Sequence, residues 1–209
     1  MHWSGRGGGH DVSSARSRWN ARYETPGATP VSQPAPFVRH LEAYLASSGT
    51  AVDIGGGLGA NAVWLASNGL DATLLDVSDV GLGHARRSIE ALPDAPVIEY
   101  LQHDVEEGGL PAGRLWDVAL MHLFFDRDVA LALPAHVRPG GIVAICQPTV
   151  VNLDRHERPG RRFLLEQGEV REIADNLVGM EIIEASAEWR SSGRHDAWLI
   201  ARRVDDTTM

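Results

Sequence analysis

Residues 51–60 read AVDIGGGLGA, a short apolar stretch that runs directly into four closely spaced glycines. The apolar part predicts a buried strand, and the glycines predict a turn whose backbone can approach a ligand closely. A helix predicted over residues 60–67 begins at the turn, so its free N–H groups and the positive end of its dipole would face that ligand. The segment therefore indicates a nucleotide-type cofactor, dinucleotides included.

The pattern on both sides of this segment alternates strands with helices. Further strands are predicted at residues 72–76, 97–101, 116–121 and 141–147, with helices at 60–67, after the capping residue Ser78 and at 129–137. Such alternation requires crossover connections and a parallel sheet covered on both faces. After a helix at 169–177, two strands follow in succession at 180–189 and 196–203, and the first alternates apolar with polar residues. We expect an α/β, Rossmann-like doubly wound fold with a mostly parallel seven-stranded sheet that ends in an antiparallel hairpin.

Composition excludes several kinds of chemistry. All 19 basic residues are Arg, and the absence of Lys excludes both a lysine Schiff base and a Walker-A phosphate loop. The single cysteine, Cys146, excludes an internal disulfide framework and any multi-cysteine zinc site, and we expect no metal. The net charge of −9 argues against a general nucleic-acid or anionic-membrane surface. No apolar run is long enough to span a bilayer and no hydrophobic signal region begins the chain, so we expect a cytoplasmic protein.

Three aspartates stand at the ends of successive predicted strands. Asp53 lies just before the glycines, where its carboxylate can hold a cationic amine or order the loop through backbone N–H groups. Asp76 ends the second strand, where it can accept both hydroxyls of a ribose and would repel a 2′-phosphate. Asp104 follows the third strand and can accept a hydrogen bond from an adenine amine. Because ligands bind at the carboxyl ends of strands in open α/β sheets, the three predict an adenosine site with little provision for phosphate.

These residues make the chain resemble the class I S-adenosylmethionine (SAM)-dependent methyltransferases. The family's glycine motif is matched by Asp53, Gly55, Gly57 and Gly59, its ribose-binding acid by Asp76 and its adenine-contacting acid by Asp104. The segment RPGG at 138–141 is similar to the family's Pro-Gly-Gly turn before the fifth strand. The segments RWNARY at 18–23, NAVWLA at 61–66 and FLLEQGEV at 163–170 are most similar to the tellurite-resistance-type branch of small-molecule methyltransferases.

The resemblance implies a particular cofactor and domain division. SAM would be the cofactor and S-adenosylhomocysteine (SAH) the product, with Val77, Val105 and Met121 as further cofactor contacts. Residues 17–204 would form the methyltransferase domain, with a disordered extension over 1–16 and a flexible tail over 205–209. The acceptor would be a small molecule, attacked in line through an S, O, N or chalcogen atom.

Methyl transfer needs the donor and acceptor held in line, and a hydroxyl or ammonium acceptor must also lose its proton. His122, after the fourth strand, is the candidate base, and its alternative role is packing or binding the cofactor backbone. Trp19 and Tyr23 would form part of a lid over the acceptor, or only pack an N-terminal helix. Arg161 and Arg162 would recognise an anionic acceptor, or belong to a solvated loop.

Two other classes of function remain open at this point. A dinucleotide-dependent oxidoreductase is loosely allowed by Gly55, Gly57 and Ala60, but the Pro-Gly-Gly turn and the terminal hairpin argue against it. A SAM-binding regulatory module without catalysis would keep the same cofactor residues. Nucleic-acid acceptors are disfavoured because neither an Asn-Pro-Pro-Tyr nor an Asp-Pro-Pro-Tyr motif is present to hold a flipped base.

Overall fold

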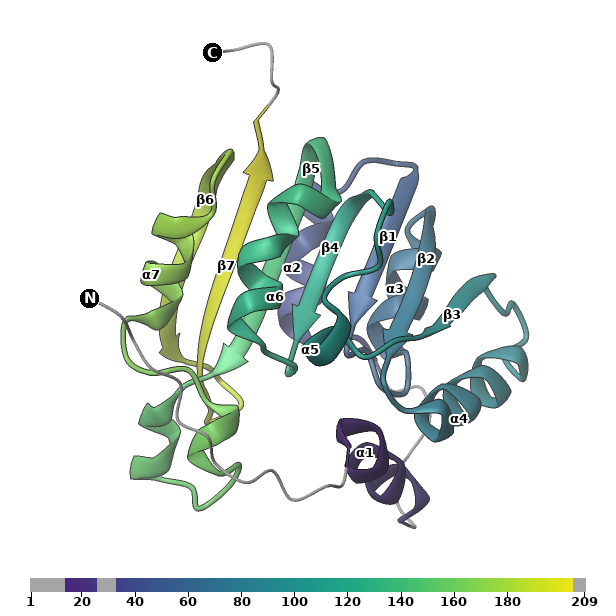
Figure 1. The fold of residues 1–209 in the computed structure, drawn as a ribbon, viewed down its shortest axis with the longest axis horizontal. Coiled ribbons are helices and arrows are strands. Elements are labelled where there is room, and N and C mark those ends of the chain that lie inside the picture. Colours follow the sequence, from purple (N-terminus) through teal and green to yellow (C-terminus); the bar gives the residue numbers. More distant parts are fainter. Residues whose placement is uncertain (1–13, 26–32, 205–209) are drawn as a thin grey trace.

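A single seven-stranded sheet runs through the molecule (Figure 1). The structure is a computed structural model and describes residues 14–25 and 33–204. The strand order is β3-β2-β1-β4-β5-β7-β6, with the first five strands parallel and β7 antiparallel to both of its neighbours. The predicted fold class, a mostly parallel sheet ending in an antiparallel hairpin, is confirmed. The strands are β1 (Gly49–Ile54), β2 (Leu70–Asp76), β3 (Ile98–Gln102), β4 (Trp116–His122), β5 (Val137–Pro148), β6 (Met180–Trp189) and β7 (His195–Arg203).

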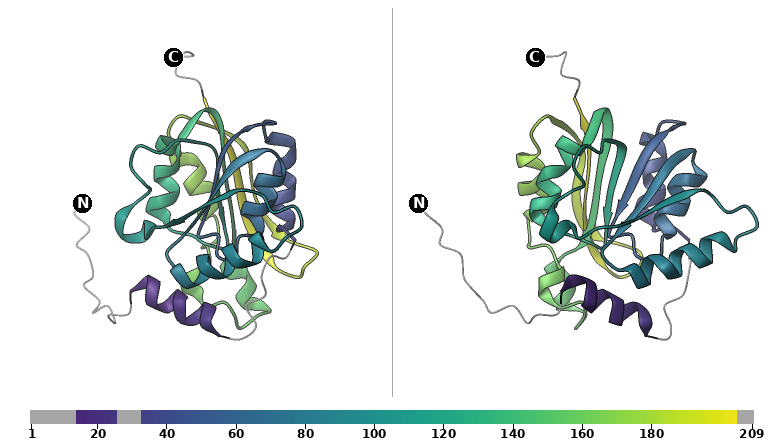
Figure 2. Two further views of the ribbon diagram at one scale, coloured as in Figure 1. Left: turned by 90° about the vertical axis from the view of Figure 1, so that its right-hand side faces the viewer. Right: turned by 45° about the vertical axis from the view of Figure 1, so that its right-hand side comes forward.

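Helices cover both faces of the sheet, which Figure 2 (left) shows nearly edge-on. On one face, α2 (Pro36–His40), the 3₁₀ turn that follows it and α3 (Ala60–Ser67) bury Val38, Leu41 and Leu65 against strand residues such as Leu120. On the other, α6 (Arg127–Ala132) and α7 (Glu169–Asn176) pack on the opposite side chains of the same strands. Both layers remove apolar surface from water, which is the main stabilising contribution to such a fold. The remaining helices are α1 (Ala15–Glu24), α4 (Asp79–Glu90) and α5 (Val105–Gly108), with short 3₁₀ turns at Leu41–Tyr44, Leu133–His136, Val150–Asp154 and Arg161–Phe163.

The RPGG segment differs from its prediction, because it lies inside β5 rather than before it. Val137 already pairs with Trp116, whereas the next pair joins Ile142 to Val118, so the partner strand advances by two residues while β5 advances by five. Gly140, with φ of 78°, occupies the left-handed region in this irregularity. The Pro-Gly-Gly segment is therefore a bulge within β5, and glycine tolerates the backbone conformation that this bulge requires.

The hairpin strand β6 also departs from a simple alternation. A register shift lies between Ile182 and Glu184, so Ile183 is an extra residue in the pairing with β7. Ile183 consequently packs with the cluster beneath α2, whereas Ala185 packs with the cluster beneath α7. The bulge thus places Ile183 on the opposite face of the sheet from Ile182 and Ala185.

Several helices end elsewhere than predicted. The helix expected over residues 129–137 is α6 followed by a 3₁₀ turn, and its last residue, Val137, belongs to β5. The segment between β5 and α7 holds two 3₁₀ turns, and α5 was not predicted. Residues 1–13 and 205–209, which carry most of the expected extension and tail, lie outside the described residues. Among the described helices, none has the length and apolar character to cross a membrane.

Candidate functional site

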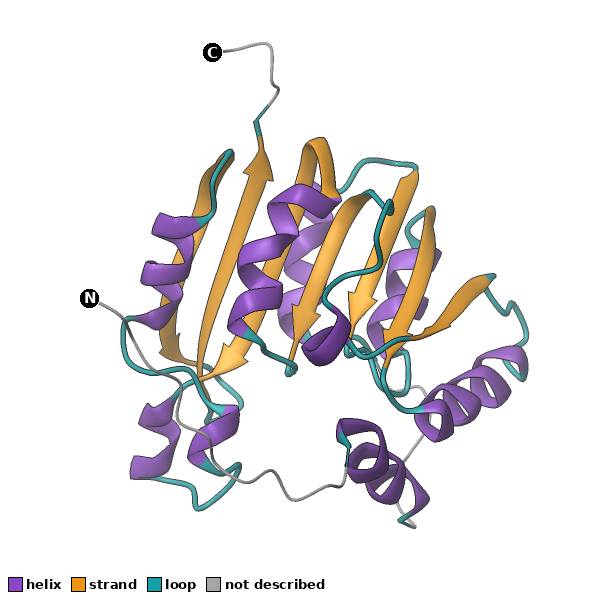
Figure 3. Ribbon diagram, viewed as in Figure 1, coloured by secondary structure: helices purple, strands orange, loops and turns teal. Residues whose placement is uncertain are grey.

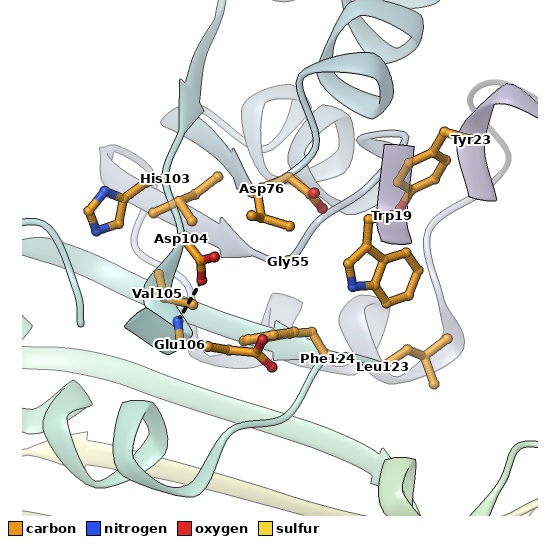
Figure 4. A pocket seen from close by; sticks show the side chains of 12 residues that line it. Trp19, Tyr23, Gly55, Asp76, His103, Asp104, Val105, Glu106, Leu123 and Phe124 are labelled. Atoms are coloured by element: carbon orange, nitrogen blue, oxygen red, sulfur yellow. Dashed lines mark hydrogen bonds between the residues drawn. The ribbon is translucent and has the colours of Figure 1, made fainter. Parts of the chain in front are cut away.

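A pocket lies between the carboxyl ends of β1 to β4 and the helix α1 (Figure 4). Figure 3 shows α1 facing these strand ends. Each of these strands contributes the residues at its end or just after it, and α1 closes the side away from the sheet. The lining residues are Trp19, Tyr23, Gly55, Leu75, Asp76, Val77, His103, Asp104, Val105, Glu106, Leu123 and Phe124. Because the strand order is β3-β2-β1-β4, the pocket runs across the sheet from Asp104 past Asp76 and Gly55 to Phe124.

The glycine loop requires residues without side chains at two points. Gly57 has φ of 56°, and a Cβ atom there would lie 2.5 Å from the hydroxyl oxygen of Tyr23. Gly55 has φ of 65°, and a Cβ atom there would lie 2.5 Å from the Cβ of Phe124. The glycines therefore serve both the turn and the close approach of α1 and the loop after β4.

Asp76 is fixed by the loop that it faces. The Gly57 N–H donates to its Oδ2 at 2.9 Å, and the Ser78 N–H donates to its Oδ1 at 2.8 Å. Burial raises the pKa of Asp76, and the hydrogen bonds from Ser78 and Gly57 oppose that rise. A buried carboxylate held by two N–H groups keeps further lone pairs for ligand hydroxyls.

Asp53 lies beneath the loop and is not among the residues that line the pocket. Its side chain is 1% exposed, and neither carboxylate oxygen accepts a well-formed hydrogen bond from any residue that the structure describes. Burial raises its pKa to about 7, although the nearby Asn61 side chain and Ala62 backbone oppose the rise. A Cβ atom on Gly56 would collide with this carboxylate, so Asp53 supports the loop directly from below.

Asp104 caps α5 at the far end of the pocket. Its Oδ1 accepts hydrogen bonds from the backbone N–H groups of Glu106, at 3.1 Å, and Glu107, at 3.3 Å. These bonds hold the carboxylate at the start of the helix, as an N-cap residue does. They are made through Oδ1, which leaves Oδ2 for a donor on a ligand.

The helix α1 brings Trp19 and Tyr23 over the pocket, where their rings stack with centroids 5.9 Å apart. The Tyr23 ring also lies against Gly81 of α4, where a Cβ atom would be 2.8 Å from it. Burial and the neighbouring Asp76 raise the pKa of Tyr23, so its hydroxyl stays protonated at neutral pH. Polar contacts anchor the same helix: Ser78 Oγ donates to Asn20 Oδ1 at 2.6 Å. Arg16 Nε and Asn20 Nδ2 both donate to Asp79 Oδ1, at 2.8 and 2.9 Å.

Other candidate residues lie away from the pocket lining. By the alternation of β4, His122 shares the face of Leu120, toward α2, and burial lowers its pKa to about 4. Met121 is fully buried on the opposite face. Arg161 is paired with Glu166 at 2.6 and 2.8 Å, and the guanidinium of Arg162 lies 4.6 Å from the Phe163 ring centroid. Gly57 and Gly59 belong to the glycine loop but do not line the pocket. Val77 and Val105, in contrast, are lining residues.

Five lining residues were not predicted: Leu75, His103, Glu106, Leu123 and Phe124. His103 and Glu106 flank the Asp104 motif, and this adjacency was the signal available in the sequence. Leu123 has φ of 60°, a left-handed conformation that a leucine rarely adopts, and its N–H donates to the Cys146 carbonyl at 3.1 Å. That conformation turns the chain after β4 so that Phe124 meets Gly55, a contact that sequence spacing does not reveal.

The sheet order, the glycine loop and the strand-end acids together define the fold as that of Rossmann-like methyltransferases. No protein-family model matches the chain, and no curated protein matches it at significant similarity. Solved structures do match. A protein solved in connection with the conversion of a disulfide bond into a thioacetal group during echinomycin biosynthesis is 18% identical, with a TM-score of 0.69, over 92% of this chain and 93% of that chain.

Two further matches are a named methyltransferase and the protein TehB. Magnesium protoporphyrin IX methyltransferase from Synechocystis PCC 6803, solved with bound SAH, is 18% identical over 79% of this chain and 81% of that chain, with a TM-score of 0.59. TehB from Haemophilus influenzae is 17% identical over 90% of this chain and 66% of that chain, with a TM-score of 0.63. The chain therefore has the fold of SAM-dependent methyltransferases, in agreement with the family resemblance of its motifs.

Proposed function

We propose that this protein is a SAM-dependent methyltransferase that acts on a small molecule in the cytoplasm. The observation that carries the proposal is the arrangement of the pocket. Asp104, Asp76 and Gly55 follow one another across the ends of β3, β2 and β1, in the order of the adenine, the ribose and the amino-acid part of the donor. Phe124, after β4, then marks the end at which the acceptor would enter.

The residues of the pocket fit this cofactor by their chemistry. Asp76, held by two backbone N–H groups, would accept the ribose hydroxyls, and Asp104 would accept the adenine amine through Oδ2. Val77 and Val105 would contact the adenine ring, and Asp53 would support the loop beneath the amino-acid part.

The charge of the pocket distinguishes this cofactor from a dinucleotide. Three carboxylates line the pocket, those of Asp76, Asp104 and Glu106, and no Arg side chain is among the described lining residues. Such a lining attracts a cationic sulfonium donor and disfavours the diphosphate of NAD. The alternative of an oxidoreductase is therefore the weaker one.

Bound SAM supplies an electrophilic methyl group whose leaving group departs as a neutral thioether, so the protein needs no acid there. The chain's own residues position the reactants and exclude water. Trp19 and Tyr23 close the pocket from above, and Phe124 packs against Gly55 at the acceptor end. His122 is neutral at pH 7 because burial lowers its pKa to about 4, and its direction toward α2 favours the packing role over that of a base.

Calorimetric titration of the purified chain with SAH and with NAD tests the proposal. We expect one saturable site for SAH and no binding of NAD. Saturable NAD binding without SAH binding would overturn it. Release of SAH from SAM in the presence of small-molecule acceptors then separates an enzyme from a SAM-binding regulatory module. Such a module would bind SAH but would methylate none of the acceptors.

A further inference from the structure

The pocket holds more negative charge than the proposed cofactor neutralises. SAM has a sulfonium, an ammonium and a carboxylate, and its single net positive charge leaves two of the three lining carboxylates unbalanced. Asp76 and Asp104 are tied to backbone N–H groups and assigned to the donor. Glu106 is the lining carboxylate that the donor does not require.

Glu106 lies two residues after Asp104, and its side chain extends from the adenine end of the pocket toward the residues that follow β4. It belongs to α5, yet its charge interacts with Arg18 of α1 and with Asp126 in the loop after β4. In Figure 4 its side chain extends toward Phe124 and away from His103. No hydrogen bond joins its carboxylate to any group within residues 14–25 and 33–204, so both oxygens are open to a ligand.

The surroundings of Glu106 favour a cation. Asp104, Asp126 and Glu107 add negative charge around it, and Arg18 is the basic residue that opposes them. Burial and these acids raise the pKa of Glu106, so its carboxylate accepts a proton more readily than an ordinary glutamate. Three aromatic rings, those of Trp19, Tyr23 and Phe124, line the same space. Aromatic faces beside a carboxylate bind ammonium groups through cation–π attraction and charge pairing.

We infer that the methyl acceptor is an amine, and that Glu106 binds its ammonium form and takes the proton that must leave before attack. The inference rests on the proposed function and names its substrate class. In the proton-transfer step, the R–NH₃⁺ group and the Glu106 carboxylate become R–NH₂ and the protonated acid. The nitrogen lone pair then forms the N–CH₃ bond as the S–CH₃ bond breaks, and the bonding pair stays on sulfur as a neutral thioether. The acid returns its proton to water.

The expected anionic acceptor fits this site less well. Arg161 is paired with Glu166, Arg162 stacks on Phe163, and neither lines the pocket. An anion would also meet the unbalanced carboxylate of Glu106 at the point of attack. Of the other titratable lining groups, Tyr23 is protonated at neutral pH, and the Nε2–H of His103 donates to the Gly109 carbonyl at 2.8 Å. Glu106 is therefore the group placed to receive the proton.

The variants Glu106→Gln and Glu107→Gln test the inference as a matched pair, since each removes one carboxylate from α5 and only the first faces the pocket. SAH release from SAM is measured with a panel of aralkyl amines and, for each amine, the thiol, alcohol and carboxylate of the same skeleton. SAH affinity is measured by calorimetry for every variant. The pH dependence of kcat/KM is recorded with the best acceptor.

We expect amines to be methylated and their thiol, alcohol and carboxylate counterparts to be inert. E106Q should lower kcat/KM by about 100-fold, the usual contribution of a general base, and remove the acidic limb of the pH profile. E107Q should keep kcat/KM within about threefold, because Glu107 does not line the pocket and its charge acts on the site only through solvent screening. The affinity for SAH should change little in both variants.

Three results would overturn the inference while leaving the cofactor assignment intact: methyl transfer to the thiols or carboxylates instead of the amines, transfer to none of the amines, or an unchanged kcat/KM and pH profile in E106Q. Loss of SAH binding in the wild-type chain is a different outcome, because it would contradict the proposed function itself. Unfolding of each variant by urea shows whether a loss of activity comes from a loss of structure.

Discussion

Gly57→Ala probes the contact that holds α1 over the glycine loop. A Cβ at this position would lie 2.5 Å from the Tyr23 hydroxyl oxygen, whereas the next atom, Cζ of the ring, would be at 3.5 Å, an ordinary contact. The clash therefore involves one atom, and it adds to the strain of placing alanine at φ of 56°. The left-handed backbone alone costs about 1–2 kcal/mol, and overpacking adds about 1–3 kcal/mol.

Gly113→Ala separates the two contributions. Gly113 has φ of 73°, and no atom lies within 4 Å of the position that a Cβ would take, so its substitution brings backbone strain without a clash. We expect G57A to lower the free energy of unfolding by about 1–3 kcal/mol more than G113A does. The double variant G57A/Tyr23→Phe, which removes the clashing oxygen, should recover most of this difference.

Urea unfolding provides the free energies, and calorimetry with SAH provides the affinity of the pocket. G57A should also weaken SAH binding, because the displaced α1 carries Trp19 and Tyr23 away from the lining. Equal destabilisation by G57A and G113A, or no recovery in the double variant, would refute the packing of Tyr23 on the loop.

Three further substitutions have definite expected outcomes. Asp76→Asn should weaken SAH binding, measured by calorimetry, by about 100-fold because a buried charged acceptor is lost. Asp71→Asn is the control, since Asp71 is exposed on the same strand, and it should leave the affinity for SAH unchanged. Asp79→Asn should speed tryptic cleavage within α1, because Asp79 anchors that helix; an unchanged rate would contradict this. The pKa of His122 is about 4 in the native state, below its value of 6.5 in the unfolded chain. The free energy of unfolding should therefore decrease as the pH falls from about 6.5 to 4, because the unfolded chain binds the proton first. His122→Gln should flatten this fall in urea unfolding, and exposed His156→Gln should not.

The sheet was predictable because its signals are local. Each parallel strand is a short apolar run, and the final hairpin carries its own alternation, so the order of elements along the chain indicates the architecture. The strand-end acids Asp76 and Asp104 both line the pocket for the same reason, since parallel strands end at one edge.

The parts that escaped prediction depend on contacts between distant residues. The bulges at RPGG and at Ile183 arise from how neighbouring strands register, which no single segment encodes. The direction of His122 follows from the face of β4, and the position of Glu106 follows from a four-residue helix too short to leave a periodic pattern. The docking of α1 depends on Asn20 meeting Ser78, residues separated by 58 positions.

A crystal structure of the chain with SAH tests the central claim most directly. The account predicts adenine beside Asp104 and Val105, and ribose hydroxyls within hydrogen-bonding distance of the Asp76 carboxylate. The homocysteine part should lie along the loop at Gly55, with its sulfur toward Phe124. SAH bound elsewhere, or with its ribose away from Asp76, would contradict the account.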